Sequence, residues 1–322
     1  MNFPIEPTEF QALTPADRVV VSQMRQNLNQ YKGLLGGPAM REQFDALIAA
    51  APAPAEVTYD AATVGGVAGW WCRPVTQRAT DSAVLYLHGG AYVAGSATAY
   101  RHFVGQLAAR VGADIFVPDY RLAPEHPFPA AVEDAQAAYQ GLLTAGRQHI
   151  AICGDSAGGG LALTTLALVT AEAARTPGAQ LPRAGVVFSP WTDLALASPS
   201  MQTKAEADFL VTKDWLAQQA TYYLQSHAPH DPNASPVYGR LAGLPPLQVH
   251  VGTDEVLRDD SLRYVAQARA AGVSVELYMW EEMPHVFAVN IGILQAAEQA
   301  LLRVSAFLSK NLMHAATTHV LS

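Results

Sequence analysis

The stretch AICGDSAGGGLAL, Ala151 to Leu163, decides the fold predicted for this chain. It joins a β-rich run to a helical pattern and holds a single serine, Ser156, among glycines at the junction. Gly154 and Gly158 fit G-x-S-x-G, the sharp strand-to-helix turn that exposes a nucleophile. Glycine is needed there because the strained turn brings backbone and neighbouring side chains close together. The alternative is a glycine-rich loop that merely enters a buried helix.

Short β-rich runs alternate with helical patterns on both sides of this stretch, from about residue 57 onward. The β-rich runs are Ala83–His88, Asp114–Tyr120, His149–Gly154, Ala184–Pro190, Leu247–Gly252 and Ser274–Trp280. The helical patterns are Ala99–Val111, Ala130–Leu143, Ala157–Ala174, Asp259–Ala271 and Ile291–Leu308. This alternation is typical of the α/β class, with a mostly parallel central sheet and helices on both faces.

Two segments lie outside the alternation. Residues 1–52 hold two amphipathic helical patterns, the first of which begins at Thr14-Pro15, a favourable cap and first helical residue. Residues 199–239 offer two more helical patterns where a strand would be expected. We therefore expect residues 53–322 to form the main domain and residues 1–52 and 199–239 to form a helical cap on it.

Composition excludes several classes of function. The chain has 322 residues, 50% of them hydrophobic and 15% charged, so it can bury a large core. A formal net charge of -8 argues against nucleic acid as a partner. Cys72 and Cys153 lie outside any metal or redox motif and are expected to be buried thiols. The N-terminus has no secretory signal and the longest apolar run, 157–170, is too short to span a membrane, so we expect a cytoplasmic protein without stable membrane insertion.

A second glycine loop, LYLHGGAYVAGS, precedes the Ser156 turn in the sequence. Adjacent glycines leave backbone N–H groups unobstructed, so Gly89 and Gly90, with Ala91 as a further candidate, can donate to an oxyanion. The Ala157 N–H at the start of the following helix is another such donor. A phosphate-binding loop is the alternative, but no lysine follows as a P-loop requires.

A serine nucleophile needs a histidine base and a carboxylate that orients it. His285 follows the β-rich run 274–280, and Asp254 follows the run 247–252, which places both at strand ends in the order serine, acid, histidine. Asp254 is the preferred acid because it lies nearest the strand end. The competing acids are Glu255, Asp259 and Asp260.

These motifs resemble those of the hormone-sensitive-lipase-like esterases, bacterial family IV, of the α/β-hydrolase fold. The matching segments, in family order, are HGGAYVAGS, VPDYRLAPEHPFPAAVED, GDSAGG, SPWTDL, GTDEVLRDD and MPHVF. The resemblance implies an α/β-hydrolase catalytic domain under a helical cap and a carboxylic-ester hydrolase. It implies nucleophile Ser156, base His285 and acid Asp254, with Gly89, Gly90 and Ala157 as the oxyanion hole.

Three positions depart from the family pattern. Ala91 stands where many members have a third glycine, and Glu282 and Val286 stand where glycine is frequent near the histidine. None of them removes a catalytic group, but each alters the pocket. The residues expected to line the substrate pocket are Ala91, Tyr92, Asp155, Trp191, Val286 and Phe287.

The sequence thus predicts hydrolysis of small, hydrophobic, short-acyl esters through an acyl-enzyme, with no metal and no organic cofactor. A lactone or acetylated substrate would use the same groups and stays open. A catalytically silent receptor of the same fold is a different class of function, and the filled acid and histidine positions argue against it. The apolar run 274–280 reads as an edge strand, which suggests a homodimer paired through it.

Overall fold

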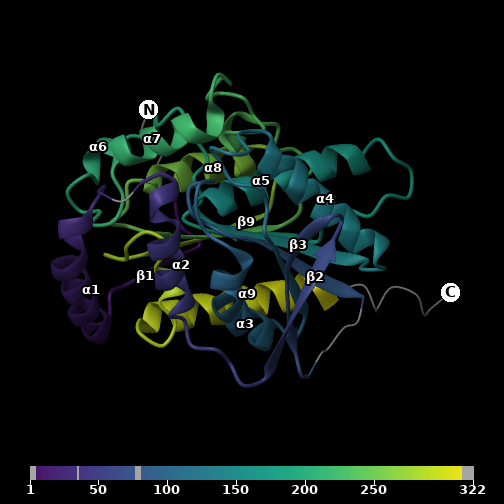
Figure 1. Ribbon diagram of the computed structural model, residues 1–322, viewed down its shortest axis with the longest axis horizontal. Helices are drawn as coiled ribbons and strands as arrows, with labels where there is room; N and C mark the ends of the chain where they lie inside the picture. Colours follow the sequence, from purple (N-terminus) through teal and green to yellow (C-terminus); the bar gives the residue numbers. More distant parts are fainter. Residues whose placement is uncertain (1–4, 35, 77–80, 314–322) are drawn as a thin grey trace.

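A computed structural model describes residues 5–34, 36–76 and 81–313 of the chain (Figure 1). Nine strands within these residues form one sheet. Their order across the sheet is β1 (Glu9–Gln11), β9 (Val275–Trp280), β8 (Leu247–Gly252), β7 (Ala184–Phe188), β6 (His149–Asp155), β4 (Ser82–Leu87), β5 (Asp114–Pro118), β3 (Val67–Pro74) and β2 (Val57–Val64). All neighbours pair in parallel except β2 with β3 and β3 with β5. The predicted α/β class with a mostly parallel sheet is therefore confirmed.

Helices cover both faces of the sheet, and Figure 1 shows them as two layers. On one face lie α3 (Ala97–Val111) and α9 (Gln295–Met313), and on the other lie α4 (Ala130–Thr144), α5 (Ser156–Ala173) and α8 (Arg258–Ala270). Successive β4 residues alternate between the two faces of the sheet. Leu85 belongs to the core on the side of α4, α5 and α8, whereas Val84 and Tyr86 belong to the core on the side of α3 and α9. Burial on both faces explains why such strands read as continuous apolar runs.

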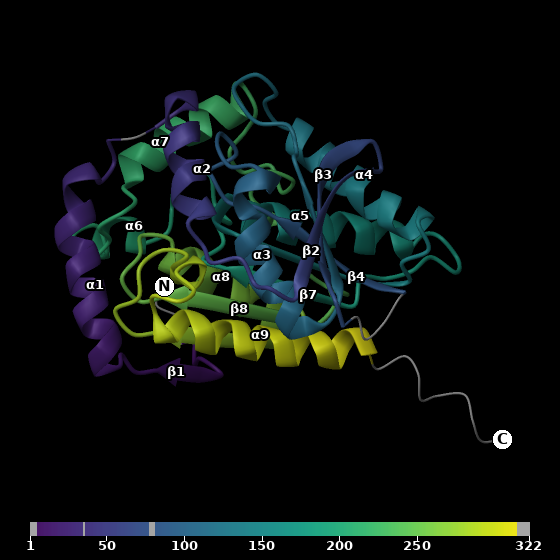
Figure 2. The same ribbon diagram turned by 60° about the horizontal axis from the view of Figure 1, so that its bottom comes forward.

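The two expected cap segments are largely helical and contact each other. The first contains α1 (Pro15–Leu28), η1 (Asn29–Tyr31), η2 (Pro38–Met40) and α2 (Arg41–Ala49), and the second contains α6 (Ser200–Thr203), α7 (Lys213–Leu224) and η3 (Pro236–Tyr238). The Gly37 N–H donates to Gln219 Oε1 at 2.8 Å, and Lys32 Nζ donates to the Ala205 carbonyl. Figures 1 and 2 show α1, α2, α6 and α7 gathered at one end of the molecule.

The N-terminal segment also contains a strand that the sequence reasoning missed. β1 pairs in parallel with β9, with Glu9 opposite Tyr278 and Gln11 opposite Trp280. The predicted strand 274–280 is therefore not a sheet edge, because β1 of the same chain occupies its outer side. The hypothesis of a homodimer through a free edge at 274–280 is wrong in that premise.

Two further predictions concern burial and membranes. Cys72 and Cys153 are both buried free thiols, as expected from their spacing. Over the part of the chain that the structure describes, no helix combines the length and apolar character needed to cross a bilayer.

Candidate active site

The serine turn lies where β6 ends and α5 begins. Ser156 has φ 52°, a left-handed conformation that non-glycine residues rarely adopt. A Cβ at Gly158 would lie 2.2 Å from the carbonyl oxygens of Leu87 and His88, and one at Gly154 would lie 2.3 Å from the Gly158 carbonyl oxygen. Both glycines are therefore required by close approach of backbone, which is the packing that a nucleophile elbow demands.

The imidazole of His285 meets the serine hydroxyl. His285 lies in the loop between β9 and the short helix η4 (Phe287–Val289), and its Nε2 is 2.8 Å from Ser156 Oγ. The two residues are 129 positions apart in the sequence, and their places after predicted strands indicate that they meet at the carboxyl ends of the strands, as they do. Within this geometry, His285 can accept the serine proton.

The carboxylate beside His285 belongs to Glu255, and the prediction that Asp254 occupies this place is wrong. Glu255 Oε2 is 2.7 Å from His285 Nδ1, and the Glu255 side chain is fully buried. Asp254 forms ion pairs with Arg25 and Lys204 instead, at 3.2 and 3.3 Å. Distance from the strand end was the wrong criterion, because adjacent side chains after β8 point to different sides of the loop.

Two donors fix the second oxygen of Glu255. Oε1 accepts from the Gly252 N–H and from the Ser189 hydroxyl, both at 2.7 Å. The Val286 N–H, next to the histidine, in turn donates to Ser189 Oγ at 3.1 Å. Ser189 thus ties the acid to the histidine loop. Ser189 lies within SPWTDL, but the sequence predicts no role for it, because a serine after a strand carries no distinctive signal.

The surroundings of His285 favour its protonated form. Burial lowers the pKa of His285, but the hydrogen bond and charge of Glu255 raise it, and the charges of Asp208 and Asp155 add to this, so the pKa lies above its ordinary value. The same negative charges that raise this pKa stabilise the imidazolium that forms when the serine proton is transferred.

The predicted oxyanion donors need one correction. The Gly89 N–H already donates to Asp155 Oδ1 and the Tyr100 hydroxyl, both at 3.1 Å, so it does not face a substrate. The N–H groups of Gly90 and Ala91 donate to no group of the described residues. Ala157 is in the first turn of α5, where N–H groups have no partner within the helix. Gly90, Ala91 and Ala157 are therefore the available donors.

The residues expected to line the pocket fall into two groups. Asp155, Tyr92, Trp191 and Phe287 are each no more than 1% exposed. The Tyr92 ring stacks on Tyr223 of α7, with centroids 3.8 Å apart, and lies 6.2 Å from Trp191. Tyr92 and Trp191 thus form a packed aromatic wall beside the serine turn, where the backbone N–H of Trp191 donates to the Ser156 carbonyl at 2.9 Å. Phe287 packs on Trp280 in the core below.

The remaining two, Ala91 and Val286, adopt left-handed backbone, with φ 55° and 50°. Glu282, the third departure from the family pattern, has φ 54°. All three residues stand where glycine is frequent in the family, and the backbone conformation that favours glycine is retained at each.

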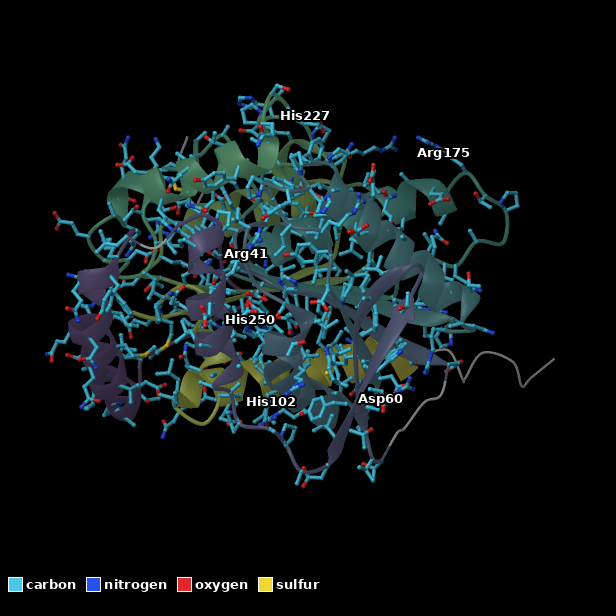
Figure 3. All side chains as sticks on the ribbon, in the orientation of Figure 1. Arg41, Asp60, His102, Arg175, His227 and His250 are labelled. Carbon is cyan, nitrogen blue, oxygen red and sulfur yellow. The ribbon has the colours of Figure 1, made fainter. Side chains whose placement is uncertain are left out.

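The segment after β5 links the glycine loop to the N-terminal helices. The Arg41 guanidinium on α2, labelled in Figure 3, donates to the Val93 and Ala123 carbonyls at 2.7 and 2.9 Å. Arg41 also pairs with Glu125 at 2.6 Å.

Among the residues described, no cluster of three or more histidine, cysteine, aspartate or glutamate side chains is arranged to hold a metal ion.

Comparison with known proteins agrees with this architecture. A family model described as the alpha/beta hydrolase fold matches residues 84–289. The chain is 41% identical over 251 residues to an acetyl-hydrolase of Streptomyces hygroscopicus, covering 77% of this chain and 82% of that protein. It is 33% identical over 234 residues to an esterase of Acinetobacter venetianus, with 72% and 76% covered. The crystal structure of an esterase from the bacterial hormone-sensitive lipase family is similar, with a TM-score of 0.85, 38% identity, and 94% and 100% covered.

A mostly parallel sheet with a serine at a strand-to-helix turn defines an α/β-hydrolase. The chain belongs to that family, and within it to the bacterial hormone-sensitive lipase group of esterases. It is an enzyme, a carboxylesterase.

Proposed function

We propose that the protein hydrolyses small, hydrophobic, short-acyl carboxylic esters with Ser156 as nucleophile, His285 as base and Glu255 as the orienting acid. One observation carries the proposal: Glu255, His285 and Ser156 form a continuous hydrogen-bonded chain, with steps of 2.7 and 2.8 Å. Such a chain fixes the tautomer in which Nδ1 bears the proton and Nε2 is free to accept one.

The first half of the reaction forms an acyl-enzyme. His285 Nε2 takes the Ser156 proton while Oγ bonds to the ester carbonyl carbon, and the carbonyl electron pair moves onto its oxygen. The Gly90, Ala91 and Ala157 N–H groups stabilise that oxyanion. As the carbonyl re-forms, the bond to the alcohol breaks, and His285 returns the proton to the leaving alkoxide.

The second half repeats these steps with water. His285 takes a proton from water, the resulting oxygen bonds to the acyl carbon, and the proton passes to Ser156 Oγ as the acid leaves. No metal or organic cofactor enters the atom balance. The complete hydrogen-bonded triad argues against a catalytically silent receptor.

Two observations support a short acyl group. The aromatic wall of Tyr92, Trp191 and Tyr223 is closely packed beside the serine turn, which limits depth there. Similar proteins carry names that refer to acetyl esters, among them the acetyl-hydrolase of Streptomyces hygroscopicus and an ethyl acetate hydrolase of Pseudomonas putida that is 31% identical. Acetylated substrates are therefore the first candidates to test, ahead of lactones.

We also assign the helices within residues 15–49 and 199–239 as a cap that covers the site, whereas β1 at residues 9–11 belongs to the sheet of the main domain. The contacts of Gly37 with Gln219 and of Lys32 with Ala205 join the two parts. The ion pair between Arg25 on α1 and Asp254 holds the N-terminal part of the cap beside the loop that carries Glu255.

Covalent labelling of the serine nucleophile tests the proposal. A fluorophosphonate probe should label the wild type and Ser226→Ala, whose serine is exposed, but not Ser156→Ala. Ser156→Ala should also abolish hydrolysis of p-nitrophenyl acetate while its circular dichroism stays unchanged. A panel of acetate, butyrate, octanoate and laurate esters should show rates that fall with acyl length. Labelling or normal turnover in Ser156→Ala would refute the mechanism, and a preference for laurate would refute the acyl limit.

A further inference from the structure

A buried carboxylate stands next to the nucleophile, and the triad makes no use of it. Asp155 is the last residue of β6 and is 1% exposed. Its Oδ1 accepts from the Tyr86 hydroxyl at 2.9 Å and from the Gly89 N–H at 3.1 Å, and its Oδ2 accepts from the Tyr100 hydroxyl at 2.9 Å. A carboxylate without such donors would be strongly destabilised at this depth.

These donors come from three separate parts of the chain. Tyr86 is on β4, Tyr100 is on α3, and Gly89 begins the glycine loop. A Cβ at Gly89 would lie 2.2 Å from Asp155 Oδ2, so the loop approaches the carboxylate as closely as only glycine permits. The contact fixes the orientation of the Gly89 N–H, and the two N–H groups that follow it in the loop keep no partner among the described residues.

The charge of Asp155 also reaches the catalytic base. Burial raises the pKa of Asp155 to about 6, although the two tyrosine hydroxyls, the charge of His285 and the Gly89 N–H lower it, so the carboxylate is ionised above that pH. The same charge contributes to the raised pKa of His285. The other titratable groups that face this pair are Tyr86, Tyr100, Tyr120, Asp208 and Glu255.

We propose that Asp155 is a positioning residue for ester hydrolysis: its carboxylate holds the glycine loop with the Gly90 and Ala91 N–H groups free for the oxyanion, and it stabilises protonated His285. This inference rests on the proposed function of Ser156 and His285. Oxyanion and imidazolium exist in the transition state and not in the bound ester. Asp155 therefore acts on kcat and leaves KM nearly unchanged.

The principal test is Asp155→Asn, which keeps the shape and removes the charge. With p-nitrophenyl acetate we expect kcat to fall at least about tenfold and KM to stay within about twofold. The inhibition constant of a trifluoromethyl ketone, which forms a tetrahedral adduct with the serine, should rise by a factor similar to the loss in kcat/KM. The acid limb of kcat/KM, followed from about pH 5 to about pH 9, should move down by about half a unit or more because His285 loses a neighbouring negative charge.

Two further variants make the result decisive. Tyr100→Phe removes one donor to the carboxylate, and should lower kcat and ketone affinity together by about threefold to tenfold. It serves in place of Asp155→Asn if that variant does not fold. Asp260→Asn removes another fully buried carboxylate, held by Ser198 and the Thr192 N–H, and should leave the acid limb and ketone affinity unchanged.

The outcomes separate the two proposals. If Ser156 is labelled in the wild type and Asp155→Asn keeps a normal or higher kcat, the positioning role is wrong. The same holds if kcat falls while both ketone affinity and the acid limb stay in place, since loss of packing alone would do that. If Ser156→Ala remains active, the triad itself fails, whatever Asp155→Asn does.

Discussion

The assignment of the acid makes opposite predictions for two adjacent residues, Asp254 and Glu255. In Glu255→Gln, the amide oxygen must still serve the Gly252 N–H and the Ser189 hydroxyl, which both donate to Oε1 at 2.7 Å. The amide NH2 group then faces His285 Nδ1. Only an unprotonated Nδ1 can accept from it, so the imidazole proton moves to Nε2, where it blocks removal of the serine proton.

The expected loss is large because two effects combine. The wrong tautomer alone costs about 10⁴-fold in kcat in the serine protease that defines this arrangement. Here the hydrogen bond and charge of Glu255 are also the main causes that raise the pKa of His285 against burial. We therefore expect kcat of Glu255→Gln to fall by about 10³-fold to 10⁴-fold, which is about 4 to 5.5 kcal/mol of transition-state stabilisation.

Asp254→Asn is the matched variant on the same loop. Asp254 pairs with Arg25 and Lys204, whose side chains are 35% and 23% exposed, whereas the hydrogen bonds of the His285 ring go to Glu255 and Ser156. Its kcat should stay within about threefold of the wild type because partly exposed ion pairs contribute little. Initial rates on p-nitrophenyl acetate decide the matter, with circular dichroism to show that both variants fold. A collapse in Asp254→Asn with normal turnover in Glu255→Gln would refute the assignment, and two normal rates would refute the need for an acid.

Two further predictions concern stability. Burial lowers the pKa of His250, which Figure 3 labels inside the molecule, to about 3, so the folded state stays neutral while the unfolded chain binds a proton below about pH 6.5. Because of this residue, the free energy of unfolding of the wild type should fall by about 2 kcal/mol between about pH 7 and pH 5. Urea unfolding should show that this contribution is absent in His250→Gln and present in the exposed control His126→Gln. Gly158→Ala should lower the free energy of unfolding by about 3 kcal/mol or more, since its Cβ would meet two backbone oxygens at 2.2 Å; unchanged urea unfolding would contradict the close packing of the serine turn.

Most of the sheet could be predicted because its strands are buried on both faces. The run Ala83–His88 is apolar up to its final histidine, and Leu247–Gly252 is buried throughout although it contains Gln248 and His250. The structure places β4 and β8 there within a residue at each end. β1 carries no such signal. It has three residues, Phe10 among them is 51% exposed, and the strand exists because its backbone pairs with β9. A pairing partner about 270 residues away cannot be inferred from a three-residue pattern.

The site residues likewise divide into those that carry a sequence signal and those that do not. Ser156 and His285 were predicted because glycine spacing and strand ends restrict where they can lie. The choice between Asp254 and Glu255 depends on the direction of a side chain, which no spacing records. Gly89 failed as an oxyanion donor for a similar reason, since its N–H direction is set by a buried carboxylate.

The backbone shows where this chain concentrates strain. Among the residues described, eight non-glycine residues have positive φ, and six of them are in the site loops: Ala91, Tyr92, Ser156, Ser189, Glu282 and Val286. Each such residue costs free energy, and it persists only where neighbours hold it in place. The Glu282 N–H donates to Thr253 Oγ1 at 2.8 Å, and the Val286 N–H to Ser189 Oγ at 3.1 Å. Hydrogen bonds between loops thus hold the His285 turn in a conformation that its own residues disfavour, so the geometry of the base depends on the acid loop and the β7 loop as much as on its own sequence.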